Sequence, residues 1–288
     1  MVYRKYTLLV LLIVTLSAQT VFAVQSQQVQ QKLAQLAAIQ GRFSFIVFGD
    51  NRSGDETYRK IVRMAVDRRP DFIVNTGDMI ETPGKRKDWA KFWELSSPIT
   101  MPYFLTVGNH DVHPKVPRSD KVYREEVDQP GNKFYYSFVA GNSLFIVLDS
   151  YLHDEEKKIT GEQLKWLEAL LAGSTQKHKF VFVHHPLYTD LGKGHHSHDS
   201  LDKYPETRDA LQALFAKYKV DAVFAGHEHY YQRQSMSNVL YIIAGGGGAP
   251  MYDSEVHGGF FHFVQVTVDG DRVSAEVVDV NGKVRDRF

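Results

Sequence analysis

The sequence contains no cysteine among its 288 residues. The absence of cysteine excludes disulfide bonds, thiolate metal sites and a lipid anchor attached through a cysteine side chain. Any metal ion must therefore be held by oxygen and nitrogen ligands. The stability of the fold must come from a packed core and from whatever metal ions the chain binds.

Long hydrophobic runs are also absent, apart from one near the start of the chain. Arg4 and Lys5 precede the apolar stretch Thr7–Leu16, and a Val-Phe-Ala sequence ends at Ala23. This arrangement is typical of a secretory signal peptide, so we expect residues 1–23 to be removed and the mature chain to be periplasmic or secreted. An uncleaved anchor is the alternative, but the run is shorter than the ~20 residues that span a bilayer.

The sequence also lacks an excess of charge of either sign. Without Arg4 and Lys5, the 34 basic residues become 32 against 34 acidic ones, so the mature chain carries a net charge near −2. This balance gives no electrostatic footprint for nucleic acid or for an anionic membrane, and it leaves small polar substrates open. The composition does not indicate an oligomeric state.

The mature chain, about 265 residues long, is sufficient for one large α/β domain, which we place at residues 42–288. Residues 24–41 are rich in glutamine and alanine. Leu33, Leu36 and Ile39 have helical spacing there, but we expect this stretch to be a solvated lead-in.

Beyond residue 41, β-rich runs alternate with amphipathic helical patterns. Strands are expected at Phe43–Phe48, Phe72–Asn75, Tyr103–Val107, Phe134–Val139, Leu144–Leu148, Phe180–Val183 and Ala222–Ala225. Helices are expected at Glu56–Arg69, Asp88–Leu95 and Thr207–Tyr218, and after Thr160, where Gln163 would complete a capping box. From Val239 onward the pattern is mostly strand, with hairpin turns at Asp269-Gly270 and Asn281-Gly282.

Short polar motifs end five of the apolar runs. They are Gly49-Asp50, Gly77-Asp78, Gly108-Asn109-His110-Asp111, His184-His185-Pro186 and Gly226-His227-Glu228-His229. A Gly-Asp pair alone is a common turn former, but the whole set in this order would not be expected by chance. Open α/β sheets place their binding crevices at the carboxyl ends of strands, so these motifs predict one shared site.

The side chains in these motifs suit metal-assisted phosphate chemistry. Two adjacent cations can neutralise phosphoryl oxygens and activate water for in-line attack, without a covalent enzyme intermediate. We expect the Asp78 carboxylate to bridge the two cations, because it has two charged oxygens. The remaining ligands are expected to be Asp50 and His229 at one cation, and Asn109, His184 and His227 at the other. This mixed oxygen and nitrogen shell favours transition metals such as manganese, iron or zinc.

The ordered motifs resemble those of the calcineurin-like metallophosphoesterases, from Phe43 to the C-terminus. The resemblance implies an α/β fold, a two-sheet αββα sandwich whose mixed sheets are flanked by helices. It implies metal ligation by the same six residues, and a catalytic role for His110, which would protonate the leaving group with Asp111 as its orienting carboxylate. The sequence also looks like the branch that contains purple acid phosphatases and cyclic-nucleotide phosphodiesterases.

One position departs from the family pattern. The first motif of the family is usually Asp-x-His, but this chain has Arg52 where the histidine would be. A guanidinium cannot ligate a cation. Three outcomes are open: Arg52 could bind a phosphate oxygen of the substrate, Glu81 could supply the missing ligand, or that metal could bind weakly. We favour the first, with Glu81 as an addition. Glu81 stands where purple acid phosphatases carry a metal-bound tyrosine, so we expect no iron-tyrosinate colour.

Other polar clusters have structural interpretations. His195, His196 and His198 are expected in a solvated loop, with a lid over the site as the alternative. We expect Gly245–Gly248 to be a close-packed turn, since it lacks the lysine and hydroxyl residue of a P-loop. His185 is expected to pack behind the ligands.

Together these patterns predict a hydrolase of small phosphate esters, either monoesters or diesters, with two divalent or trivalent metal ions. A different class of function is also open, namely a phosphate- or metal-binding protein that has lost catalysis through Arg52. The intact His110 and Asp111 argue against this alternative, because a binding protein has no need of a proton donor.

Overall fold

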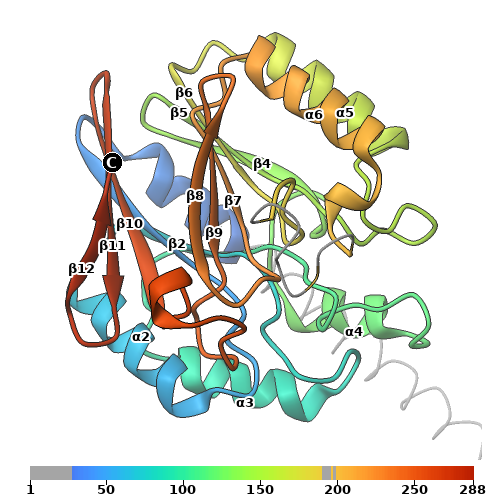
Figure 1. Ribbon diagram of the computed structural model, residues 1–288, viewed down its shortest axis with the longest axis vertical. Helices are drawn as coiled ribbons and strands as arrows, with labels where there is room; N and C mark the ends of the chain where they lie inside the picture. The colour runs from blue at the N-terminus through green and yellow to red at the C-terminus, as the bar shows by residue number, and fades with distance from the viewer. Residues whose placement is uncertain (1–27, 190–195, 197–198) are drawn as a thin grey trace, which may run out of the picture.

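The computed structural model describes residues 28–189, residue 196 and residues 199–288. The signal peptide expected at residues 1–23 lies outside these ranges. Two six-stranded sheets face each other in the described part of the chain, as Figure 1 shows. None of the helices in the described ranges is both long and apolar enough to cross a bilayer.

The first sheet combines parallel and antiparallel strands in the order β12-β11-β10-β1-β2-β3. Its strands are β1 (Phe43–Phe48), β2 (Phe72–Asn75), β3 (Tyr103–Leu105), β10 (His262–Asp269), β11 (Arg272–Asp279) and β12 (Val284–Arg287). Strands β1, β2 and β3 run parallel, so their carboxyl ends meet at one edge of the sheet. The predicted turns at 269–270 and 281–282 connect β10 to β11 and β11 to β12.

The second sheet has the order β4-β5-β6-β7-β9-β8. Its strands are β4 (Tyr136–Ala140), β5 (Ser143–Val147), β6 (His178–Phe182), β7 (Ala222–Ala225), β8 (Tyr231–Met236) and β9 (Val239–Ala244). Strands β5, β6, β7 and β9 are parallel to one another, while β4 and β8 are antiparallel edge strands. Both sheets are therefore mixed, as expected.

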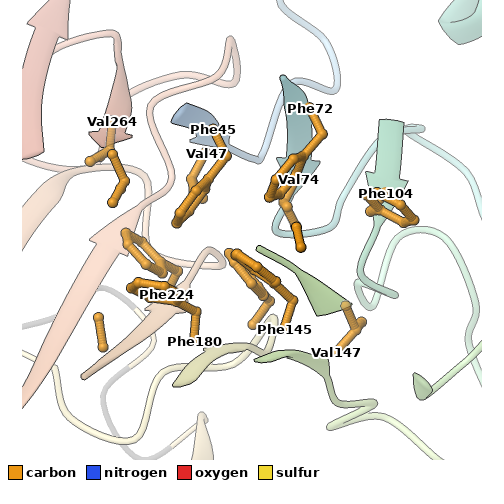
Figure 2. Close-up of a cluster of buried hydrophobic side chains, with 14 of the residues drawn as sticks. Phe45, Val47, Phe72, Val74, Phe104, Phe145, Val147, Phe180, Phe224 and Val264 are labelled. Atoms are coloured by element: carbon orange, nitrogen blue, oxygen red, sulfur yellow. The ribbon is translucent and has the colours of Figure 1, made fainter. Parts of the chain in front are cut away.

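Phenylalanine rings fill the space between the two sheets (Figure 2). Strand side chains alternate between the two faces of a sheet. In β1, Phe43, Phe45 and Val47 face the other sheet, while Ile46 and Phe48 face the helices. The Phe45 ring lies 5.2 Å from that of Phe145 at an angle of 89°. Because both faces of β1 are covered, five of its six residues are apolar, and its sequence does not alternate.

Helices cover the outer face of each sheet, which gives the four-layer αββα sandwich that the resemblance implied. The first sheet carries α2 (Asp55–Asp67), α3 (Arg86–Ser96) and α4 (Ser119–Glu126). The second carries α5 (Gly161–Gly173) and α6 (Pro205–Lys217). Two short 3₁₀ helices, η1 (Leu201–Lys203) and η2 (Glu255–His257), lie in loops.

Two local expectations were wrong. Residues 28–37 are helical and are not a solvated lead-in, because Leu36 is only 1% exposed in the core between the sheets. The capping box at α5 is also absent, since Thr160 makes no side-chain cap. The Gln163 amide instead bonds the backbone N–H and carbonyl of Asp149, each at 2.8 Å.

Candidate metal centre

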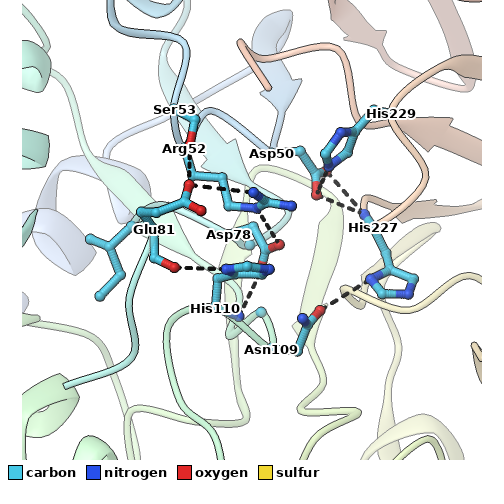
Figure 3. Close-up of polar contacts among 12 residues, drawn as sticks. Asp50, Arg52, Ser53, Asp78, Glu81, Asn109, His110, His227 and His229 are labelled. Atoms are coloured by element: carbon cyan, nitrogen blue, oxygen red, sulfur yellow. Dashed lines mark hydrogen bonds and ion pairs between the residues drawn. The ribbon is translucent and has the colours of Figure 1, made fainter. Parts of the chain in front are cut away.

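Five strand ends deliver the predicted ligands to the same edge of the two sheets. Asp50, Asp78 and Asn109 follow the parallel strands β1, β2 and β3, while His184 and His227 follow the parallel strands β6 and β7. The six predicted ligands come together, as Figure 3 shows for five of them. Five of the six are buried, with at most 4% of each residue exposed: Asp50, Asp78, His184, His227 and His229.

One set of donor atoms gathers around the Asn109 amide oxygen. This oxygen lies 3.0 Å from His184 Nε2 and 3.1 Å from His227 Nδ1. His184 Nε2 is also 3.4 Å from Asp78 Oδ1. Four donor atoms from four loops thus point at one place, and we call Asp78, Asn109, His184 and His227 the inner set.

A second, smaller set lies around Asp50. His229 Nε2 is 3.6 Å from Asp50 Oδ1. Ligand atoms of Asp50, Asp78 and His184 all lie within 4.8 Å of one another, which places the second set beside the inner one. We call Asp50 and His229 the outer set, and the Asp78 carboxylate lies next to both sets.

Carbonyl oxygens fix which nitrogen of two histidines faces the centre. His184 Nδ1 lies 2.9 Å from the Thr76 carbonyl oxygen, and His229 Nδ1 lies 2.8 Å from that of Pro250. A carbonyl accepts a hydrogen bond, so each Nδ1 carries the proton and each Nε2 keeps its lone pair. Metal-binding histidines are usually held in this way. The donor set therefore fits a transition metal.

The backbone holds several of these side chains in strained conformations. Asp50, Asp78 and His227 have φ angles of 57°, 57° and 70°, in the left-handed region that non-glycine residues rarely adopt. Two glycines of the motifs are needed for a different, steric reason. A Cβ on Gly108 would lie 2.2 Å from Asp78 Oδ1, and one on Gly226 would lie 2.4 Å from Asp50 Oδ2. Gly108 and Gly226 are therefore required by close approach of a ligand carboxylate, while Gly77 is required by close approach of the His184 ring.

Arg52 points into the centre beside Asp78. Its Nε lies 3.3 Å from Asp78 Oδ2, and one terminal nitrogen lies 3.4 Å from Glu81 Oε2. Figure 3 shows the guanidinium between these two carboxylates. The Arg52 side chain is 14% exposed, whereas that of Glu81 is 51% exposed and also accepts a hydrogen bond from Ser53. Glu81 is thus engaged with Arg52 and Ser53.

The roles expected of His110 and Asp111 need one correction. The Asp111 carboxylate makes no hydrogen bond to His110 among the described residues. It accepts four hydrogen bonds from the backbone N–H groups of Asp78, Met79, Ile80 and Gly108. The His110 ring instead contacts the Glu81 carbonyl oxygen through Nδ1, at 2.8 Å. Asp111 therefore positions the loop that carries Asp78, because a fully buried carboxylate must find its partners locally.

Burial sets the protonation of the centre. It lowers the pKa of His229 to about 3, and it lowers the pKa values of His184 and His227 as well. These imidazoles are neutral near pH 7, which is the form that binds metals. Burial raises the pKa of Asp50 well above its usual value, and repulsion from Asp78 adds to the increase. Burial would also raise the pKa of Asp78, but His184, His110 and Arg52 lower it.

Comparison with known proteins agrees with this geometry. A family model described as calcineurin-like phosphoesterase matches residues 43–231. The chain belongs to this family. A purple acid phosphatase from Glycine max is 32% identical over 179 residues, which are 57% of this chain and 36% of that protein. The serine/threonine-protein phosphatase CPPED1 of Homo sapiens is 27% identical over 229 residues, 70% of each chain.

A solved structure shows the same family fold. Purple acid phosphatase PPD1 from yellow lupin (Lupinus luteus) seeds has a TM-score of 0.69 with this chain at 22% sequence identity. The match covers 86% of this chain and 53% of that one. The chain thus spans about a third of the Glycine max protein and about half of the lupin protein.

Two residues near the centre, His196 and Tyr252, are not among the predicted site residues, although the alternative for the loop of His196 was a lid over the site. The half-buried His196 lies with its ring 4.3 Å from that of His227, and its backbone N–H donates to Glu228 Oε1. His196 is therefore not simply part of a solvated loop, while His195 and His198 lie outside the described residues. The Tyr252 ring stacks on that of His229 at 3.9 Å. The only sequence signal for His196 was its place in a histidine-rich stretch, and Tyr252 had none.

His185 is fully buried, with its Nδ1 2.8 Å from the Ser150 hydroxyl. A ring nitrogen of His185 also lies within 4.8 Å of donor atoms of His184 and His227, so His185 lines the centre and does not simply pack behind it. The glycine-rich run forms a close-packed turn next to the first motif. A Cβ on Gly247 would lie 2.2 Å from the Gly49 carbonyl oxygen, and one on Gly245 would lie 3.0 Å from Asp50 Oδ2.

Proposed function

We propose that the chain is a metal-dependent hydrolase of small phosphate esters, either monoesters or diesters. The observation that carries this proposal is the convergence of six oxygen and nitrogen ligands from five strand ends, with neutral imidazoles among them. Membership of the calcineurin-like phosphoesterase family supports the same reaction.

The two donor sets assign the ligands. Asp78, Asn109, His184 and His227 would hold one cation, and Asp50 and His229 would hold a second with the other oxygen of Asp78. Manganese, iron and zinc suit these oxygen and nitrogen ligands. When bound, the cations would neutralise phosphoryl oxygens and activate a water molecule for attack on phosphorus.

Two cationic or protonatable side chains complete the proposed machinery. Arg52 uses Nε and one terminal nitrogen on Asp78 and Glu81, and its other terminal nitrogen makes no hydrogen bond among the described residues. That nitrogen can donate to a phosphoryl oxygen. His110 Nδ1 donates to the Glu81 carbonyl oxygen, which leaves Nε2 directed away from that contact. In the imidazolium form, Nε2 also carries a proton and can donate it to the leaving-group oxygen.

The location of the protein is part of the proposal. The basic start, apolar run and Val-Phe-Ala sequence of residues 1–23 support export of the mature chain to the periplasm or the medium. A phosphate- or metal-binding protein without catalysis is the alternative, and turnover measurements distinguish the two.

The test uses metal-stripped protein with manganese, zinc or iron added back, and a panel of chromogenic phosphate monoesters and diesters. His110→Ala should lower turnover by ~10²-fold or more with near-normal metal content, because the variant loses a proton donor but no ligand. Asp78→Ala should instead lower the metal content itself, because Asp78 is a proposed ligand. His153→Ala is the matched control, because His153 is 71% exposed and pairs only with its neighbour Asp154 among the described residues. Metal uptake without turnover of any ester would favour the binding protein.

A further inference from the structure

The two donor sets differ in how complete they are. The inner set supplies four donor atoms, and three distances among them are between 3.0 and 3.4 Å. Such a set can saturate most of the first shell of a transition metal without help from other residues. The outer set supplies only two residues of its own, Asp50 and His229, in addition to the shared Asp78.

A permanent positive charge lies beside the outer set. Arg52 Nε is 3.3 Å from Asp78 Oδ2, while His184 Nε2 lies near Asp78 Oδ1. The guanidinium thus occupies the Asp78 oxygen that a second cation would need. A guanidinium stays protonated in proteins, so this positive charge is permanent.

Counting charges shows the consequence of this placement. Carboxylates bind a cation in their ionised form, so with a cation present Asp50 and Asp78 would contribute two negative charges, and Arg52 contributes one positive charge. The half-exposed Glu81 lies outside this buried group. One divalent cation would bring this group to a net charge of plus one, and a second would bring it to plus three. Both carboxylates are at most 1% exposed, so water screens this excess poorly.

Glu81 does not restore the missing ligand. Its carboxylate already accepts hydrogen bonds from Ser53 and from Arg52, and its side chain is half exposed. Both hydrogen bonds are made by Oε2, and Glu81 does not belong to the group of Asp50, Asp78 and His184 whose ligand atoms lie within 4.8 Å of one another.

We propose that this chain binds one transition-metal ion tightly, at the inner set, and that Arg52 takes the place of the second ion's charge beside Asp78. The centre is then one cation plus one guanidinium, and the outer set binds a second cation only weakly. This inference rests on the proposed metal-dependent function. It is compatible with a hydrogen bond from Arg52 to the substrate, since the second terminal nitrogen stays available.

The experiment measures binding of Mn²⁺ to metal-stripped protein by equilibrium dialysis and elemental analysis, together with the electron paramagnetic resonance signal of the bound ion. The wild-type chain should bind one tight equivalent and give the signal of an isolated ion. In Arg52→His and Arg52→Met, the second equivalent should bind about tenfold more tightly or better, because the repelling charge is gone. Only the histidine adds a ligand, so Arg52→His should show the larger gain and the signal of a coupled pair.

Two controls isolate the charge. Arg52→Lys keeps it and should bind the second equivalent as weakly as the wild type does. Arg233→His changes an arginine that pairs with Asp286 on an edge strand, and it should leave both equivalents unchanged. Urea unfolding curves check that each variant is folded. If Arg52→His does not fold, Arg52→Met provides the test of the charge.

The outcomes separate this inference from the proposed function. Two equally tight equivalents in the wild type, or no tightening in either neutralised variant, would overturn the inference and leave the hydrolase intact. A wild-type chain that takes up no cation would overturn both. One tight equivalent with ester hydrolysis would support both.

Discussion

Asp111 offers the sharpest test of how the centre is held together. In Asp111→Asn, one carboxylate oxygen becomes an NH₂ group that faces backbone N–H donors and cannot accept from them. Whichever oxygen is replaced, two of the four hydrogen bonds are lost. On one oxygen these are the bonds from Asp78 and Gly108, at 2.9 and 2.8 Å. On the other they are the bonds from Met79 and Ile80, at 2.9 and 3.3 Å.

The size of the loss follows from the burial of this carboxylate. A hydrogen bond to a charged group contributes about 1.5–3 kcal/mol, so two of them amount to about 3–6 kcal/mol. Asp111 is 0% exposed, so water cannot replace the lost partner. Because domains are stable by only about 5–15 kcal/mol, the substitution should remove a large fraction of the free energy of unfolding.

Urea unfolding of the metal-free protein, followed by tryptophan fluorescence, measures this loss without a contribution from metal binding. Asp71→Asn is the matched control, since Asp71 accepts a single exposed hydrogen bond from the Ser44 N–H that asparagine can keep. It should cost about 1 kcal/mol or less. An unchanged free energy of unfolding in Asp111→Asn, with lowered turnover alone, would refute the structural role and restore an orienting role toward His110.

Two further predictions concern residues outside the centre. Gln163→Ala should destabilise the fold by about 2 kcal/mol, because it removes two hydrogen bonds to the Asp149 backbone. Thr160→Ala should cost under about 0.5 kcal/mol, because the Thr160 side chain makes no cap. Urea unfolding compares the two variants. Burial lowers the pKa of His262 to about 4, so the unfolded chain binds more protons than the folded one between about pH 6.5 and 4. The free energy of unfolding should therefore fall as the pH falls through this range, by up to about 3 kcal/mol. His262→Gln can still donate to the Phe260 carbonyl and should abolish this loss, as unfolding curves at pH 7 and pH 4 would show.

The parts of the fold that the sequence predicted are those with strong local patterns. β1, β2 and β7 have the predicted bounds, because buried parallel strands are short apolar runs that end at polar motifs. The ligands were found for the same reason, since each follows such a run. β8 and α4 were missed. The sequence of β8, Tyr231–Met236, is mostly polar and only half buried, and its pairing with β9 decides its conformation.

The errors at the site arose where a residue's partner is distant in the sequence. The family resemblance implied that Asp111 orients His110, but the hydrogen bonds of Asp111 reach back more than thirty residues to the Asp78 loop. Gln163 likewise has the spacing of a capping box, and tertiary contact with Asp149 takes its amide instead. Local patterns cannot rank such competing partners, because burial decides which one must be satisfied.

The way the inner set is supported explains why the centre can tolerate an arginine in place of a ligand. Besides the contact of Arg52 with Asp78, the inner set has other supports: His184 is held by the Thr76 carbonyl, and the Asp78 loop is held by Asp111. These supports all come from backbone groups or from a buried carboxylate outside the ligand set. A substitution at position 52 therefore changes the charge at the outer edge of the centre while the geometry of the inner set persists. The number of bound cations can then vary independently of the fold that holds the first one.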